Sequence, residues 1–345
     1  MSPGLSYAVI RCHAMRAELL NPAVFKTLVE AKTYEEYMDV LNTTSYATGS
    51  DTRPRTALEL EGFLNQVFIA RLQRIVSFSP QRIAEFLRIF FLMRLEIQNL
   101  MRIVRLRFSP DSGWTRTLAL IPVEPLFSIP YGRLLEQGTI EGFVEALEPT
   151  IYKDVKNGLN MAKQHDALWP LEVYLNSAFH VRASGVISGL DSSDRVIVRE
   201  ILKTETDVEN VLAALSWRRK LRDRLPPPDF FPYAYRVTPM QLIELIEGAS
   251  LADITKTVNQ VYIRILEPMV ELDDVSLVRR NLRQYVYEYA ERCRTQDDFG
   301  FPCIFSLLVS FETEKDALVA LGWGKEQRIS TEKLLRYTVL PSVLG

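Results

Sequence analysis

Apolar residues recur at helical spacing along most of the chain. Leu60, Leu64, Phe68 and Leu72 stand four positions apart, so their side chains line one face of a helix. No stretch shows the sustained alternation of apolar and polar residues, rich in β-branched side chains, that is typical of strands. The pattern therefore predicts an all-α protein.

Prolines and capping residues set the expected helix ends. The Asn21-Pro22 step ends the first helix, and Thr33 with Glu36 reads as a capping box. Short helices are expected to begin at Thr139, Thr238, Ser250 and Ser330. The longer expected helices cover residues 7–20, 22–31, 35–41, 60–77, 80–107, 169–187, 192–202, 206–224, 274–295 and 305–321.

Several short motifs recur at nearly constant offsets. The hexapeptide Leu60-Glu61-Gly62-Phe63-Leu64-Asn65 returns as Leu171-Glu172-Val173-Tyr174-Leu175-Asn176, and Glu96 to Asn99 answers to Asp207 to Asn210, both 111 positions later. Leu212 to Trp217 matches Leu318 to Trp323 at an offset of 106, as Tyr46 matches Tyr152. The chain therefore reads as three repeats, each expected to be a helical bundle. Their expected ranges are 1–121, 122–228 and 229–345, the last preceded by a proline-rich linker at 225–229.

Composition excludes some classes of function. The 345 residues carry a formal net charge of −2, and the sequence pI of about 6.1 provides no field for nucleic acid. The three cysteines, Cys12, Cys293 and Cys303, are odd in number and lack C-x-x-C spacing, which disfavours a disulfide framework or a zinc site and indicates a reducing compartment. No signal peptide or transmembrane span is expected, because charged residues interrupt every long apolar run.

No catalytic, cofactor or metal motif stands out. Gly322-Trp323-Gly324-Lys325 lacks the Ser or Thr and the preceding strand of a phosphate loop, and a glycine at a helix C-cap explains it better. His13, His165 and His180 form no H-E-x-x-H pair. We therefore expect no catalytic residue, cofactor, metal or small-molecule substrate.

The repeated acidic and amide residues are the most pointed polar signal. In each pair the two side chains share a helix face beside the apolar stripe. They can act as buried clasps that bond a loop or a neighbouring helix, or as a polar wall facing a cavity or partner. Recurrence in each repeat favours clasps, and Glu61, Asn65, Glu172 and Asn176 are then expected to be buried and bonded within their own bundles. The full candidate set is Glu61, Asn65, Glu96, Asn99, Arg102, Glu172, Asn176, Asp207 and Asn210.

Basic clusters offer a second kind of candidate site. A solvated helix face is their ordinary explanation, and a docking rim for an acidic partner is the functional one. RNA binding is disfavoured because aromatic residues are not interleaved with the basic ones. The candidate docking residues are Arg11, Arg16, Arg105, Arg218, Arg219, Arg279 and Arg280.

The opening of the chain resembles a known family. Tyr7, Arg11, the Ala14-Met15-Arg16 step and Leu19-Leu20 match the start of the C subunit of archaeal and bacterial V/A-type rotary ATPases, the equivalent of the d subunit in eukaryotic V-ATPases. The Glu-x-x-Asn-x-x-Arg step at 96–102, the chain length and the repeats fit as well. Val9 and His13 depart from the family pattern, and the third repeat has Thr313 and Asp316 where the Glu-x-x-Asn pair is expected.

The resemblance implies a funnel of three bundles in pseudo-threefold arrangement around a central cavity. It implies a non-catalytic central-stalk subunit that couples ATP hydrolysis or synthesis to proton or sodium translocation. Its partners would be the D-type and F-type shaft subunits at the cavity and the proteolipid rotor ring at the other end. The protein would be cytoplasmic, peripheral to the membrane and monomeric when isolated. A helical-repeat scaffold for an unrelated protein and an enzyme with an unrecognised site remain the alternatives.

Overall fold

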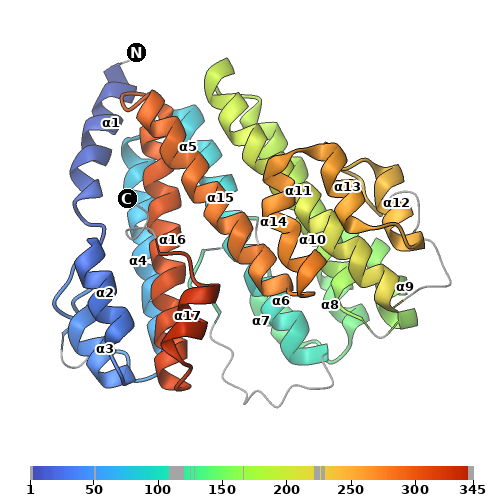
Figure 1. Ribbon diagram of the computed structural model, residues 1–345, viewed down its shortest axis with the longest axis horizontal. Helices are drawn as coiled ribbons and strands as arrows, with labels where there is room; N and C mark the ends of the chain where they lie inside the picture. The colour runs from blue at the N-terminus through green and yellow to red at the C-terminus, as the bar shows by residue number, and fades with distance from the viewer. Residues whose placement is uncertain are drawn as a thin grey trace. The chain divides into compact units, whose positions relative to one another are not determined.

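The computed structural model describes residues 3–49, 52–108, 120–124, 126–127, 129–165, 167–220, 226 and 230–340. Over these residues every regular element is a helix, which confirms the all-α prediction (Figure 1). Within the same ranges, no helix is both long and apolar enough to cross a membrane. The expected linker at 225–229 lies outside the described residues except for Pro226.

The chain folds into two compact units. Unit 1 combines Met1–Leu87 with Asp274–Gly345, and unit 2 is Arg88–Asp273. These units differ from the three sequential ranges expected at 1–121, 122–228 and 229–345. The reason is that the last long helix, Phe301–Glu326, packs against helices near the start of the chain. The threefold division of the chain stays a prediction.

Unit 1 is built around one buried helix. It contains α1 (Pro3–Arg16), α2 (Pro22–Glu30), α3 (Tyr34–Leu41), α4 (Ala57–Phe78), α5 (Gln81–Leu87), α15 (Val275–Gln296), α16 (Phe301–Glu326) and α17 (Thr331–Tyr337). Helix α16 packs against α1, α4 and α15 (Figure 1). Nearly all of its side chains are buried. Its sequence is largely apolar on every face, which is typical of a helix enclosed by other helices.

Two glycines let neighbouring helices approach α16 closely. A Cβ atom on Gly322 would clash with the side chain of Leu60 on α4, and one on Gly324 would clash with Leu334 on α17. Both glycines lie inside α16, which continues to Glu326. The expected C-cap role was therefore wrong, and close helix packing explains this Gly-x-Gly step.

Unit 2 surrounds two long helices. It contains a π-helical turn at Arg88–Leu92, α6 (Met93–Phe108), α7 (Tyr131–Glu136), α8 (Ile140–Leu147), a 3-10 turn at Lys153–Val155, α9 (Lys156–His165), α10 (Trp169–Ile187), α11 (Ser192–Lys220), α12 (Pro239–Glu247), α13 (Leu251–Val258) and α14 (Gln260–Glu271). Helix α10 packs against α6, α9 and α11, while α11 also packs against α12 and α14. Edge-to-face contacts among Trp169, Trp217 and Phe230 fill part of its core.

Two expected helix boundaries differ from the structure. The helices expected at 192–202 and 206–224 form the single helix α11 as far as Lys220, and residues 221–224 lie outside the described residues. Within α11 the hydroxyls of Thr204 and Thr206 donate to the carbonyls of Glu200 and Leu202 in the preceding turn, so neither hydroxyl competes with the helix by bonding elsewhere. In place of the single helix expected at 80–107, α5, the π-helical turn at Arg88–Leu92 and α6 follow one another along the chain. Residues 89–92 of that turn are all buried. A π-helical turn inserts an extra residue and rotates the faces on either side of it.

Candidate functional site

Three buried carboxylates occupy equivalent positions on long helices. Glu96 on α6 and Asp207 on α11 are fully buried, and Glu314 on α16 is 1% exposed. Each accepts the hydroxyl of a buried tyrosine and at least one main-chain N–H from a loop. We call each such arrangement a carboxylate clasp.

The first clasp lies in unit 2 and centres on Glu96. Its Oε1 accepts the hydroxyl of Tyr152 at 2.7 Å, and its Oε2 accepts the main-chain N–H of Leu126 at 2.8 Å. One turn along α6, the Asn99 amide exchanges two hydrogen bonds with the main chain of Ile121, at 2.9 and 2.7 Å. Glu96 and Asn99 thus fix the segment before α7 to α6.

The second clasp, also in unit 2, centres on Asp207. The hydroxyl of Tyr262 donates to Oδ2 at 2.7 Å, and the main-chain N–H groups of Tyr235 and Arg236 donate to the two oxygens at 2.8 Å each. Asn210 donates to the carbonyl of Tyr233 at 2.6 Å. Asp207 and Asn210 therefore fix the segment before α12 to α11, as Glu96 and Asn99 fix the segment before α7 to α6.

The third clasp lies in unit 1 and centres on Glu314. Its Oε1 accepts the hydroxyl of Tyr46 at 2.6 Å, and its Oε2 accepts the main-chain N–H of Leu20 at 2.7 Å. Arg71 on α4 adds a cation, with Nη1 3.7 Å from Oε1 and its guanidinium over the Tyr46 ring. The segment before α2 is thereby fixed to α16.

The three clasps share one spacing along the chain. The tyrosine stands 26 positions after a loop donor in every case, as Leu20 and Tyr46 illustrate. Two short helices fill each interval: α2 with α3, α7 with α8, and α12 with α13. The helices that carry Glu96 and Asp207 precede their loops, whereas the helix that carries Glu314 follows its loop by most of the chain.

Sequence comparison missed Glu314 by one position. The offset of 106 placed Thr313 and Asp316 opposite Asp207 and Asn210. In the structure Glu314 takes the place of the acid, and the buried Ala317 stands where the amide is expected. No spacing in the sequence would have found Glu314, because its partners Leu20 and Tyr46 lie 294 and 268 positions away.

Burial dominates the electrostatics of the clasps. Desolvation raises the pKa of Glu96, Asp207 and Glu314 above their ordinary values, although the tyrosine and main-chain donors act in the opposite direction. Burial also raises the pKa of Tyr46, Tyr152 and Tyr262, so each keeps its proton and donates it. The clasps are therefore built to hold loops in place.

The first hexapeptide behaves largely as expected. Asn65 is buried, donates to the carbonyl of Glu61 at 2.9 Å and faces Nζ of Lys315 at 3.4 Å. Glu61 is half-buried and accepts the indole N–H of Trp323 at 3.1 Å. Both residues thus bond α16 from α4, outside the sequence range in which their partners were expected.

The second hexapeptide departs from expectation. Glu172 is half-buried and pairs with Arg105, and Arg102 is half-buried on the same helix as Arg105. Asn176 is exposed, so the buried clasp expected of it was wrong. The matching residues on α4 and α10 are not buried alike, because burial depends on which helix covers that face.

The candidate docking arginines fall into two groups by exposure. Arg11, Arg105, Arg219 and Arg279 are exposed, whereas Arg16, Arg218 and Arg280 are half-buried. Most of them already have partners within their unit. Arg11 lies over the rings of Tyr7 and Phe78, Arg105 pairs with Glu172, Arg219 pairs with Asp273, Arg218 donates to the carbonyl of Ala249, and Arg280 donates to Asn281.

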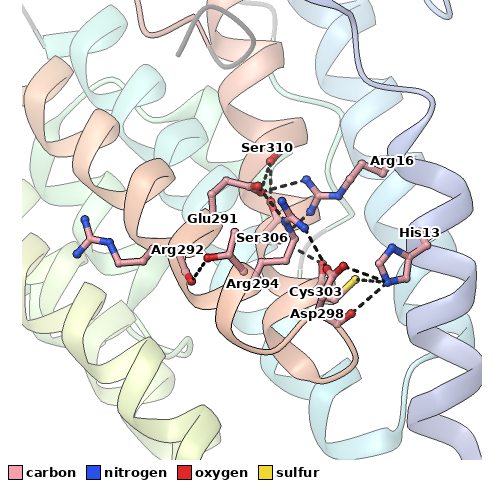
Figure 2. A network of polar contacts seen from close by, with 10 residues as sticks. His13, Arg16, Glu291, Arg292, Arg294, Asp298, Cys303, Ser306 and Ser310 are labelled. Carbon is pink, nitrogen blue, oxygen red and sulfur yellow. Dashed lines mark hydrogen bonds and ion pairs between the residues drawn. The ribbon is translucent and has the colours of Figure 1, made fainter. Parts of the chain in front are cut away.

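Arg16 belongs to a polar network that joins α1 to α15 and α16 in unit 1. Its Nη1 pairs with Glu291 at 3.1 Å and its Nη2 donates to Ser306 at 2.8 Å (Figure 2). His13 and Cys303 lie at the end of this network, with Nε2 and Sγ 3.7 Å apart. Burial raises the pKa of the Cys303 thiol to about 11, so the thiol stays protonated and is a poor nucleophile.

Comparison with known proteins points to one family. The sequence profile described as ATP synthase (C/AC39) subunit matches residues 8–337. The chain is 22% identical to the C subunit of the A-type ATP synthase of Methanocaldococcus jannaschii, over 95% of this chain and 84% of that protein. It is also 22% identical to the proteins of the same name from Pyrococcus furiosus, over 90% of this chain and 82% of the relative, and from Desulfurococcus sp., over 95% and 89%.

Proposed function

The chain belongs to the ATP synthase (C/AC39) subunit family, and from this we propose that it is the non-catalytic central-stalk subunit of an A/V-type ATP synthase. The observation that carries the proposal is the family match over residues 8–337, nearly the whole chain. In this role the protein is a socket between the soluble rotor shaft and the membrane rotor ring. It couples ATP hydrolysis or synthesis to the translocation of protons or sodium ions.

The proposed partners meet the protein at separate ends. Shaft subunits of the D and F types enter a central cavity, and the proteolipid ring lies against the other end. The protein is then cytoplasmic, peripheral to the membrane and a monomer when isolated. The pseudo-threefold funnel and the three bundles at 1–121, 122–228 and 229–345 are part of this proposal.

The carboxylate clasps suit a part that carries torque. A protein between a shaft and a ring must transmit twist without unwinding, and close-packed interiors transmit strain because they compress little. Glu96, Asp207 and Glu314 each fix a loop to a long helix by two or more hydrogen bonds. Such bonds resist local unwinding where helices are short.

The basic helix faces carry the proposed docking groups. Four of these arginines are exposed (Arg11, Arg105, Arg219 and Arg279) and three are half-buried (Arg16, Arg218 and Arg280). Binding that rests on exposed charges weakens as salt screens them. Washing with salt should therefore release the protein from its partners.

Reconstitution tests the coupling role. Membranes that contain the complex are stripped of the protein, and ATP-driven ion uptake is measured before and after the purified chain is added back. We expect uptake to vanish on stripping and to return on addition, while the isolated chain hydrolyses no ATP. Uptake that persists in the verified absence of the protein would exclude the coupling role.

A further inference from the structure

Three potential metal ligands meet in unit 1, where α1 passes the turn between α15 and α16. His13 lies on α1, Asp298 in the turn and Cys303 in the first turn of α16 (Figure 2). Nε2 of His13 is 3.7 Å from Sγ of Cys303 and 3.8 Å from Oδ2 of Asp298. The three ligand atoms all lie within 4.8 Å of one another.

These separations and atom types fit a zinc ion. Tetrahedral zinc with ordinary bond lengths separates a nitrogen and a sulfur ligand by about 3.6 Å, and a nitrogen and an oxygen ligand by about 3.3 Å. The two distances from Nε2 exceed these values by about 0.1 and 0.5 Å. The Cys303 sulfur and the Asp298 oxygen lie within 4.8 Å of each other, and changes in side-chain torsions would bring all three atoms to bonding distance of one ion. We propose that His13, Asp298 and Cys303 form a zinc-binding site, with water as the fourth ligand.

The surroundings orient the carboxylate ligand. Arg294 donates to Oδ1 of Asp298 at 3.1 Å, which leaves Oδ2 turned toward His13. Glu291 in turn holds Arg294 at 2.9 Å and Arg16 at 3.1 Å. Hydrogen bonds of this kind fix the orientation of metal-binding carboxylates.

The site is open on one side and closed beneath. The side chains of His13 and Asp298 are 37% and 36% exposed, whereas Cys303 is fully buried. An ion can therefore arrive from solvent between the two exposed ligands and meet the thiol at the bottom. This arrangement shields the Cys303 sulfur from other reactions while leaving it available to a metal.

Zinc binding requires two proton changes. Without metal, Nε2 of His13 lies 3.0 Å from the main-chain oxygen of Asp298, as when an Nε2–H donates to it. On binding, the imidazole proton resides on Nδ1, the Nε2 lone pair bonds the ion, and the Cys303 proton leaves to solvent. One thiolate and one carboxylate then balance the two charges of zinc.

The bound ion would fasten α1 to the turn between α15 and α16. These segments are nearly 300 positions apart in the sequence. The site concerns unit 1 alone, so it does not depend on the role proposed above. Metal in this position would stabilise unit 1 in any assembly that contains it.

Titration of the purified full chain with zinc alone tests the proposal. The thiols are first reduced and any metal removed with a chelator, and binding is followed by calorimetry. We expect about one zinc per chain and a higher melting temperature with zinc. The variants His13→Gln and Asp298→Asn, which change half-exposed side chains, should each weaken binding by about tenfold or more.

Cobalt distinguishes the proposed sulfur ligand from other thiols. Co²⁺ in place of zinc should give the thiolate-to-cobalt absorption band, which Cys303→Ser removes and Cys293→Ser retains. Cys293 is a buried thiol outside the cluster, so it is a matched control. Unchanged zinc affinity in both His13→Gln and Asp298→Asn, or no stoichiometric zinc in the folded wild type, would overturn the proposal.

Discussion

At the scale of single residues, the stability of the fold depends on a few buried carboxylates and on the hydrogen-bond donors that surround them. Each of Glu96, Asp207 and Glu314 satisfies its oxygens with a tyrosine hydroxyl and main-chain N–H groups. A buried acceptor that loses its donor costs more than the hydrogen bond alone contributed. The tyrosines are therefore expected to matter more than their apolar surface suggests.

Removal of one hydroxyl tests this directly. Tyr152→Phe should lower the free energy of unfolding by about 1–3 kcal/mol, because Glu96 loses its tyrosine donor while the ring still packs. Chemical denaturation followed by circular dichroism measures the change. Tyr7→Phe is the control, since Tyr7 is 53% exposed and should change the stability by less than about 0.5 kcal/mol. Equal effects of the two substitutions would contradict the clasp.

The pH dependence of Glu96 has a defined sign. Its pKa is raised above 4.5 in the folded state, chiefly by desolvation, so the folded chain binds more protons than the unfolded chain between the two pKa values. The contribution of Glu96 to stability is full below pH 4.5 and is lost as pH rises through the folded pKa. Glu96→Gln lacks this titration. The stability of wild type relative to Glu96→Gln should therefore fall as pH rises from about 4 to 7. A relative stability that rises over this range would refute the sign.

At the scale of elements, α16 sets the packing of unit 1. It contacts α1, α4 and α15 and accepts close approaches at Gly322 and Gly324. Its buried glutamates are paired from neighbouring helices, Glu312 with Arg283 and Glu314 with Arg71, and Arg283 also pairs with the half-buried Asp316. These pairs therefore fix the rotation of α16 about its own axis, because only one rotation satisfies all of them.

A methyl group at Gly324 should disturb this packing. Gly324→Ala places a Cβ against three atoms of Leu334, so we expect a net loss of about 1–2 kcal/mol in spite of the better helix propensity of alanine. The double variant Gly324→Ala with Leu334→Ala should cost less than the sum of the two single substitutions, because removing the leucine also removes the clash. Thermal unfolding measures both.

Gly62→Ala is the matched control for that experiment. Gly62 lies within α4, and a Cβ there meets nothing within 4 Å. The substitution should stabilise the chain by about 0.5–1 kcal/mol through helix propensity alone. If Gly324→Ala stabilised the chain as Gly62→Ala does, α17 would not be packed against α16 as described.

At the scale of the whole molecule, the first and last parts of the chain fold together into unit 1. Unit 1 combines residues 1–87 with 274–345, and Glu314 in the second range bonds Leu20 and Tyr46 in the first. Unit 2 contains the other two clasps. Segments that share a clasp should therefore open together in local unfolding.

Amide hydrogen exchange can compare the clasps in one chain. Glu314→Gln should accelerate exchange in α2 and α3, and Asp207→Asn should accelerate exchange in α12 and α13, because each variant weakens one clasp. Each variant is the control for the other. Acceleration that spreads equally over both units in both variants would show that the clasps do not act locally.

The sequence by itself determined the helical class and the long helices. Apolar spacing such as Leu60, Leu64 and Phe68 and caps such as Thr33 are local properties, and local interactions reproduce them wherever the segment packs. The recurrence of Tyr46 and Tyr152 pointed to two of the three clasp tyrosines. The opening residues from Tyr7 to Leu20 also indicated the family that the profile later matched.

Only the tertiary structure decided which segments meet. Glu314 joined Leu20 over almost the full length of the chain, and His13 came to face Cys303 and Asp298, although no spacing in the sequence linked them. Asn65 was covered by α16, while Asn176, at the matching position of the second hexapeptide, stayed exposed. Burial and long-range pairing depend on which helix covers a given face. That choice is made by the summed packing of the unit, and no single segment encodes it.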